Sequence, residues 1–131
     1  MNATVENNNG TGMVDIAMMR GTAAQLLGPD DGPDALPPAS AELGALAAAL
    51  RGHLEVLIPQ VEAKAGRLHK NNPTRFCALA CVGEASRKLR VADGCTPAVR
   101  VAVARKLARS VNALCDHYAK LCGEAPAGER P

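Results

Sequence analysis

The chain has 131 residues, which is enough for one domain and too few for two comfortable ones. Hydrophobic residues make up 47% of it but aromatic residues only 2%, so a core must be built from Leu, Val and Ala. The formal net charge of +2 excludes a chain that is basic or acidic throughout, and no apolar run is long enough to span a membrane.

The first 14 residues are polar and rich in Asn and Gly, which predicts a disordered leader. Met1, Met13, Met18 and Met19 are all candidates for the translational start. No basic region is followed by an apolar run and a cleavage site, so we expect no signal peptide and a cytoplasmic protein with reduced thiols.

A short helix is predicted over residues 15–27, with Asp15 as its N-cap and Gly28 at its end. Its apolar positions are Ile16, Met19, Ala23, Leu26 and Leu27. A helix this short is marginal alone, so we expect it to cover a groove on larger helices. The next segment, 28–39, is rich in Pro and Asp and is predicted to be a linker.

A second helix is predicted over residues 40–68, with Ser40 as its cap. Apolar residues keep a spacing of three or four along it: Leu43, Leu46, Ala47, Leu50, Leu54, Leu57, Val61, Ala65 and Leu68. Pro59 falls nearly opposite this stripe, so we expect a bend there and not a helix end.

Asn72 and Pro73 mark the start of a third helix over residues 74–91. We expect it to bury its apolar residues, which are Phe76, Leu79, Val82, Ala85 and Leu89. Its basic residues Arg87, Lys88 and Arg90 should face solvent, and Gly83 suits a tight helix crossing.

The last predicted helix, over residues 96–122, has Thr96 as N-cap and Gly123 as a left-handed C-terminal cap. Its apolar stripe comprises Val103, Leu107, Val111, Leu114, Tyr118 and Leu121. The opposite face should be solvated, and it carries Arg105, Arg109, Asn112, Asp116 and Lys120.

Two short connections between three long helices demand antiparallel neighbours. The sequence therefore predicts an all-α fold, with three long helices in an up-down-up bundle and a short N-terminal helix as a lid. The single helical domain should cover residues 15–122, and residues 123–131 should form a flexible tail.

Charge is divided unevenly along the chain. Residues 1–68 hold eight acids and four bases, giving −4, whereas residues 73–91 hold one acid and four bases, giving +3. Residues 97–122 hold one acid and five bases, giving +4. Such asymmetry is compatible with a nucleic-acid surface, but no aromatic residue is interleaved for stacking, which favours solvated helix faces.

The five cysteines, at 77, 81, 95, 115 and 122, are best interpreted as small buried apolar side chains. Cys77 and Cys81 share a helix face, but the C-x3-C spacing is unusual for zinc and no second ligand pair accompanies it. We therefore expect no structural metal. No motif for a nucleophile, a phosphate or another cofactor occurs, so no catalytic or cofactor-binding residue is predicted.

His53 lies at the edge of an apolar stripe and is expected to make one hydrogen bond. Glu55 and Glu62 share a helix face, where ion pairs with Arg100 or Arg105 are favoured over acid–base catalysis. The candidate functional surface consists of His53, Arg105, Arg109, Asn112, Asp116 and His117.

A resemblance to a known family is carried by four stretches of the chain. They are RGTAAQLLGPD, LAAALRGHLEVLIPQVEAKAGRL, ALACVGEASRKL and, above all, ARKLARSVNALCDHYAKL. They resemble a family of short actinobacterial proteins of unknown function, some of which are described as natural-product biosynthesis proteins. The resemblance implies a bacterial cytoplasmic protein encoded near specialised-metabolism or regulatory genes. It carries over no catalytic residue.

These observations favour a non-enzymatic helical interaction module that acts as an accessory or regulatory factor. The alternatives are a small helical nucleic-acid-binding protein and a carrier of an apolar small molecule. The partner should be another protein or a second copy of the chain, because a core without large aromatic side chains leaves apolar surface to cover. In a homodimer, Val99, Ala102, Ala113 and Cys122 should lie near the interface, with Leu107 and Leu114 inside the protomer.

Overall fold

The computed structural model describes residues 14–28 and 38–123, and this part of the chain contains helices and no strand. The helices are α1 (Ile16–Leu27), α2 (Ser40–Gly66), α3 (Pro73–Leu89) and α4 (Pro97–Cys122). The predicted all-α class is therefore confirmed. The expected leader, most of the linker and nearly all of the tail lie outside the described residues.

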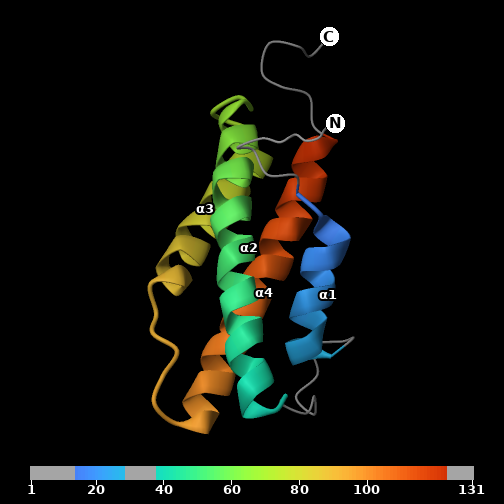
Figure 1. The fold of residues 1–131 in the computed structure, drawn as a ribbon. Coiled ribbons are helices and arrows are strands. Elements are labelled where there is room, and N and C mark those ends of the chain that lie inside the picture. The colour runs from blue at the N-terminus through green and yellow to red at the C-terminus, as the bar shows by residue number, and fades with distance from the viewer. Residues whose placement is uncertain (1–13, 29–37, 124–131) are drawn as a thin grey trace, which may run out of the picture.

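The two long helices α2 and α4 form the centre of the bundle (Figure 1). The short helix α1 packs against α4 and α2, and α3 packs against the same two helices without touching α1. In Figure 1, α2 and α4 run upward while α1 and α3 run downward. Both α2 and α4 contact each of the other three helices.

Side-chain caps begin three of the helices where the sequence predicted them. Backbone N–H groups donate to Asp15 Oδ1 at 3.0 Å, to Asn72 Oδ1 at 2.8 Å and to Thr96 Oγ1 at 3.2 Å. The prediction for Ser40 was wrong, because Ala39 occupies the N-cap position and makes no side-chain bond there. Ser40 is already helical, and its Oγ accepts from Arg100 Nη1 at 3.1 Å.

The helix ends differ more from expectation. Gly28 has the positive φ of 73° that favours glycine, but Gly123 has φ −92° and ψ −4°, so the predicted left-handed cap is wrong. Helices α2 and α3 each end two residues earlier than predicted, at Gly66 and Leu89. Pro59 is exposed and α2 continues through it, as its position opposite the stripe indicated.

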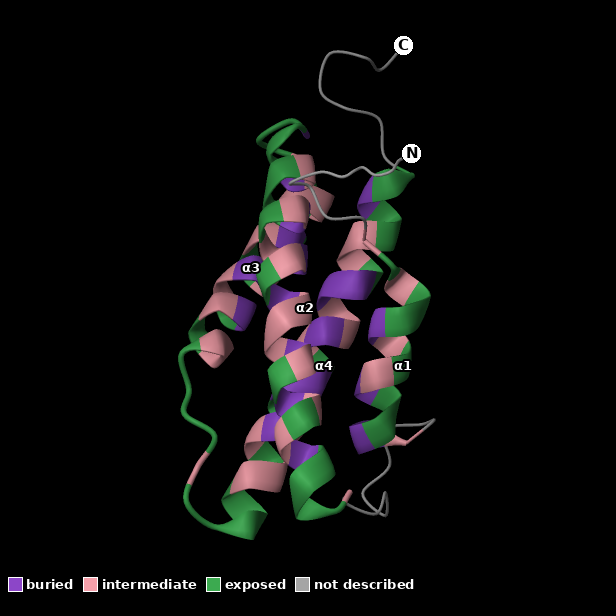
Figure 2. Cartoon of the chain, viewed as in Figure 1, coloured by how far each residue is buried: buried purple, intermediate pink, exposed green. Residues whose placement is uncertain are grey.

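The core consists of aliphatic side chains from all four helices, with Cys115 and Met19 (Figure 2). Leu54, Leu114 and Val111 are completely buried. The predicted stripes of α2 and α4 are confirmed, although Leu46, Val103 and Tyr118 are only half-buried. Helix α4 also buries a row of small residues that the stripe did not include, namely Ala104, Ala108 and Cys115. These side chains widen its buried face because three helices surround it.

The prediction that Phe76 is buried was wrong, since the residue is 74% exposed. The buried row of α3 is Ala78, Val82 and Ala85. Phe76 precedes Ala78 by two positions, which corresponds to about 200° around a helix and turns the ring outward. Gly83 makes no tight crossing either, because a Cβ there would meet only the Arg87 side chain of its own helix, at 3.7 Å.

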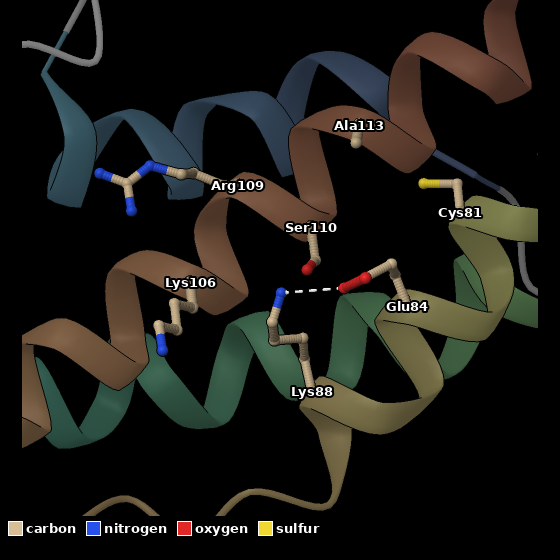
Figure 3. A pocket seen from close by; sticks show the side chains of 7 residues that line it. All are labelled: Cys81, Glu84, Lys88, Lys106, Arg109, Ser110 and Ala113. Atoms are coloured by element: carbon tan, nitrogen blue, oxygen red, sulfur yellow. Dashed lines mark hydrogen bonds and ion pairs between the residues drawn. The ribbon is translucent and has the colours of Figure 1, made fainter.

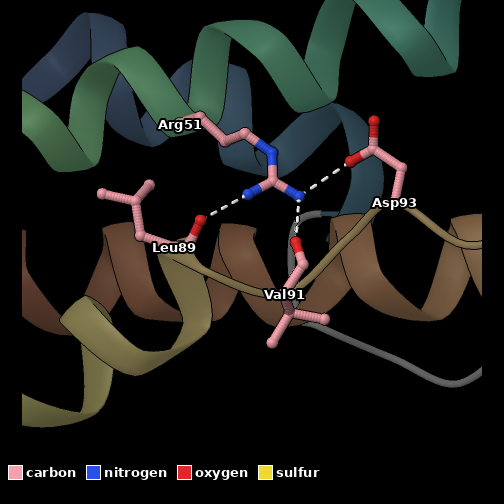
Figure 4. A network of polar contacts seen from close by, with 4 residues as sticks. All are labelled: Arg51, Leu89, Val91 and Asp93. Carbon is pink, nitrogen blue, oxygen red and sulfur yellow. Dashed lines mark hydrogen bonds and ion pairs between the residues drawn. The ribbon is translucent and has the colours of Figure 1, made fainter.

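Arg51 of α2 joins the end of α3 to the connection that follows it (Figure 4). Its Nη1 donates to the Leu89 carbonyl at 2.8 Å, and its Nη2 donates to the Val91 carbonyl at 2.6 Å and to Asp93 Oδ1 at 2.8 Å. The following Gly94 has φ +100°, and a Cβ there would collide with the Val99 side chain. The guanidinium thus ties the end of α3 and the following connection to α2, and Gly94 lets that connection pass close to Val99 of α4.

Candidate functional site

A groove of about 240 Å³ runs between α3 and α4 (Figure 3). Its lining residues are Cys81, Glu84 and Lys88 from α3 and Lys106, Arg109, Ser110 and Ala113 from α4. Within each helix these residues recur at spacings of three, four or one, so each helix turns one side toward the groove. We call this surface the α3–α4 groove.

The α3–α4 groove is positively charged. Its one carboxylate, Glu84, accepts from Lys88 Nζ at 3.3 Å and from Arg87 Nη2 at 3.2 Å. These two hydrogen bonds hold the pKa of the Glu84 carboxyl below its ordinary value, and the bond from Lys88 has the larger effect. Three cations against one carboxylate leave the lining with a formal charge of +2.

An apolar hollow adjoins the α3–α4 groove. It has a volume of about 90 Å³ and shares Lys88 and Lys106 with the groove. Val91, Val103 and Leu107 complete the lining of this hollow, and Val91 is 45% exposed. The lysine stems can cover apolar surface while their ammonium groups stay in water. The cations of the α3–α4 groove thus lie next to an aliphatic hollow.

The thiol in the α3–α4 groove is not activated as a nucleophile. Burial raises the pKa of Cys81, and the carboxylates of Glu84 and Asp116 raise it further. Burial also raises the pKa of Cys115 to about 11. The interpretation of all five cysteines as buried was wrong, because Cys77, Cys95 and Cys122 are exposed and Cys81 is half-buried. The groove therefore suits recognition better than thiol chemistry.

The structure separates the residues of the predicted functional surface. Arg109 lines the α3–α4 groove, whereas Arg105 Nε donates to the Leu26 carbonyl of α1 at 3.3 Å. Asp116 pairs with Arg20 of α1 at 2.7 Å. The face of α4 predicted to be solvated is thus partly covered by α1. Asn112 and His117 are half-buried on α4 and do not line the groove.

The carboxylates Glu55 and Glu62 do not pair with the predicted arginines. Arg100 donates to Ser40, and the ion pairs within residues 14–28 and 38–123 include neither glutamate. Lys88, Lys106 and Ser110 were not among the predicted site residues. The sequence signal that points to them is the charge of +3 and +4 on two consecutive predicted helices. Because a short connection joins these helices, their basic faces lie together.

His53 makes the single hydrogen bond expected of it. Its Nε2 lies 3.2 Å from Thr22 Oγ1, and that hydroxyl donates its proton to the Met18 carbonyl at 3.1 Å. The hydroxyl therefore accepts from an Nε2–H of His53. Burial lowers the pKa of His53 below the ordinary value of 6.5, because the charged imidazolium loses hydration there.

We predict that the His53 imidazole titrates with a midpoint below pH 6.5, as followed by the chemical shift of its Cε1 proton in an NMR pH series. The imidazole of the unfolded chain takes up a proton more readily than the buried one. The contribution of neutral His53 to the free energy of unfolding is therefore complete above pH 6.5 and is lost as pH falls toward the folded pKa. The unfolding free energy of His53→Gln should therefore fall less than that of the wild type as pH is lowered through this window. A folded midpoint above 6.5 would contradict the account.

Val99, Ala102 and Cys122, which the sequence placed near a dimer interface, are exposed on α4, and Ala113 lines the α3–α4 groove. Leu107 and Leu114 are buried within the protomer. In the part of the chain that the structure describes, no helix is both long and apolar enough to cross a membrane. The described side chains also contain no group of three or more His, Cys, Asp or Glu that could hold a metal ion.

Comparison with known proteins identifies the chain by family alone. The model of a family of unknown function, DUF6415, matches residues 17–123. No curated protein and no solved structure matches. The match spans most of the chain and nearly all of the helical bundle. The chain therefore belongs to the DUF6415 family.

Proposed function

We propose that the chain is a non-enzymatic helical interaction module whose α3–α4 groove binds an acidic segment of another protein. The observation that carries the proposal is the composition of this groove, which is lined by three cations, Lys88, Lys106 and Arg109, and by one carboxylate, Glu84, that is already paired with Arg87 and Lys88. Complementary charge steers association and selects the partner. An aliphatic side chain of the partner would enter the hollow beside Val103 and Leu107.

The charge of the groove favours a different protein over a second copy of the chain. In a two-fold dimer through this face, the positively charged groove of one copy would meet the same positively charged surface of the other, because a two-fold interface uses the same patch on both subunits. Juxtaposed like charges oppose association. Self-association through Val99 and Ala102 stays a prediction, and it would have to avoid this repulsion.

The resemblance noted in the sequence supports a biological setting for the proposal. It suggests an actinobacterial cytoplasmic protein encoded near specialised-metabolism or regulatory genes, a setting in which an accessory factor that binds a partner protein would fit. Nucleic-acid binding is the competing function, because the same cations would contact phosphates.

Affinity capture with the tagged full chain tests the proposal. We expect a partner protein to be retained from a lysate of the organism that encodes the chain, and to be lost with the double variant Lys106→Glu, Arg109→Glu. Both positions are exposed, and the melting temperature of the variant is measured to show that it is folded. The matched control is Arg67→Glu, Lys120→Glu, which makes the same change of charge at exposed positions outside the groove.

Two outcomes would contradict the proposed function. One is equal retention of the partner by the groove variant and the control variant. The other is loss of the captured material after nuclease treatment, with a steep dependence of binding on salt, which would favour the nucleic-acid function.

A further inference from the structure

A second groove, of about 380 Å³, lies at the start of α3 and shares no residue with the α3–α4 groove. Lys70, Arg75, Phe76, Leu79 and Ala80 line it, and we call it the Phe76 groove. Phe76 is the one Phe of the chain, and its 74% exposure leaves an aromatic face beside half-buried Leu79. The exposed ring and Leu79 together form a small apolar surface that lies beside two cations, Lys70 and Arg75.

The cations of the Phe76 groove are not neutralised within the described chain. No carboxylate lines the groove, and the ion pairs of residues 14–28 and 38–123 include neither Lys70 nor Arg75. The Nε of Arg75 is buried and has no hydrogen-bond partner in this part of the chain. Arg75 therefore lines the groove with a guanidinium that has no carboxylate partner among the described residues.

We propose that the Phe76 groove binds a small organic anion that carries a planar apolar ring. The ring would pack against Phe76 and Leu79, and a carboxylate, sulfonate or phosphate would lie between Lys70 and Arg75. The volume of the groove falls in the range of small-molecule sites. The proposal is independent of the proposed function, because it involves no residue of α4.

Two dyes of nearly the same shape test the need for both features. The probe is 1-anilinonaphthalene-8-sulfonate, whose ring system carries one anionic group, and its comparison is the uncharged N-phenyl-1-naphthylamine. Fluorescence titration of the purified full chain should show one sulfonate dye per chain, bound about tenfold or more tightly than the uncharged dye.

Substitutions then locate the bound dye. Phe76→Ala and the double variant Lys70→Gln, Arg75→Gln should each weaken binding of the sulfonate dye by about tenfold. The matched controls, Val99→Ala and Lys120→Gln, remove an exposed aliphatic group and an exposed cation elsewhere and should leave binding unchanged. Unchanged melting temperatures would show that each variant is folded, and Phe76→Leu provides a milder replacement of the ring.

Three results would overturn this proposal. Equal affinity for the two dyes would remove the role of the cations, and equal loss of binding in groove and control variants would show nonspecific adsorption. The third result is that the chain sediments with phosphatidylglycerol vesicles, while the Phe76 and Lys70/Arg75 variants do not sediment with them but still bind the dye. That result would assign the surface to a membrane instead. None of these results bears on the α3–α4 groove, so the two proposals fail separately.

Discussion

Leu114→Ala is expected to lower the free energy of unfolding by about 2–5 kcal/mol, as measured by urea denaturation followed by circular dichroism. Leu114 is completely buried on α4, one of the two helices that contact all the others. Removing its side chain would leave a cavity in the aliphatic core, and the surrounding structure relaxes only partly into such a space. Small domains have total stabilities of about 5–15 kcal/mol, so one such change is severe.

The matched control is Phe76→Ala, which deletes a larger side chain from a surface position. Because Phe76 is 74% exposed, its truncation should change the unfolding free energy by no more than about 0.5 kcal/mol. The two variants together test whether α3 is oriented as described. If Phe76→Ala were the more destabilising of the two, α3 would have to be rotated to bury the ring.

The second large effect is expected at Arg51. Arg51→Ala should cost roughly 1.5–3 kcal/mol of unfolding free energy, because it deletes the charged donor of three hydrogen bonds. The bonds to the Leu89 and Val91 carbonyls carry most of this value. The ion pair with Asp93 adds little, since that carboxylate is 56% exposed.

Two further variants make the Arg51 prediction specific. Arg51→Lys keeps the charge but lacks the planar fork that reaches two carbonyls and a carboxylate, so it should recover only a small part of the loss. Arg90→Ala removes a nearby exposed arginine and should be nearly neutral. Full stability of Arg51→Lys would show that charge alone suffices and that the fork geometry is unimportant.

The helices were predictable from the sequence because their signals are local. Asp15, Asn72 and Thr96 cap their helices through bonds to residues two or three positions away, and such bonds follow from residue type and spacing. Gly123 and Ser40 were mispredicted. A glycine permits a left-handed cap without requiring one, and Ser40 instead meets Arg100, a partner 60 residues away.

The orientation of α3 was not predictable by ranking residues by hydrophobicity. Phe76 and Leu79 are the larger apolar side chains, yet the buried row holds Ala78, Val82 and Ala85. Small residues let α3 pack against α2 and α4 together, and this advantage depends on tertiary contacts. The same contacts explain Arg105, which the helix pattern assigned to solvent although α1 covers it.

The α3–α4 groove was predictable in its charge but not in its composition. The excess of bases on both helices is visible in the sequence, and their short connection makes them neighbours. The pairing of Glu84 within α3 also follows from spacings of three and four. Which α4 residues face α3 depends on the rotation of both helices, and this selects Lys106 and Ser110.

Zero-length cross-linking by a carbodiimide tests the central claim most directly, because it joins a lysine amine to a carboxylate in contact with it. In the captured complex, mass spectrometry should find Lys106 or Lys88 joined to an Asp or Glu of the partner protein. The lysines outside the α3–α4 groove, Lys64, Lys70 and Lys120, provide internal controls in the same sample. Cross-links confined to these three lysines, with none at Lys88 or Lys106, would contradict the proposed function.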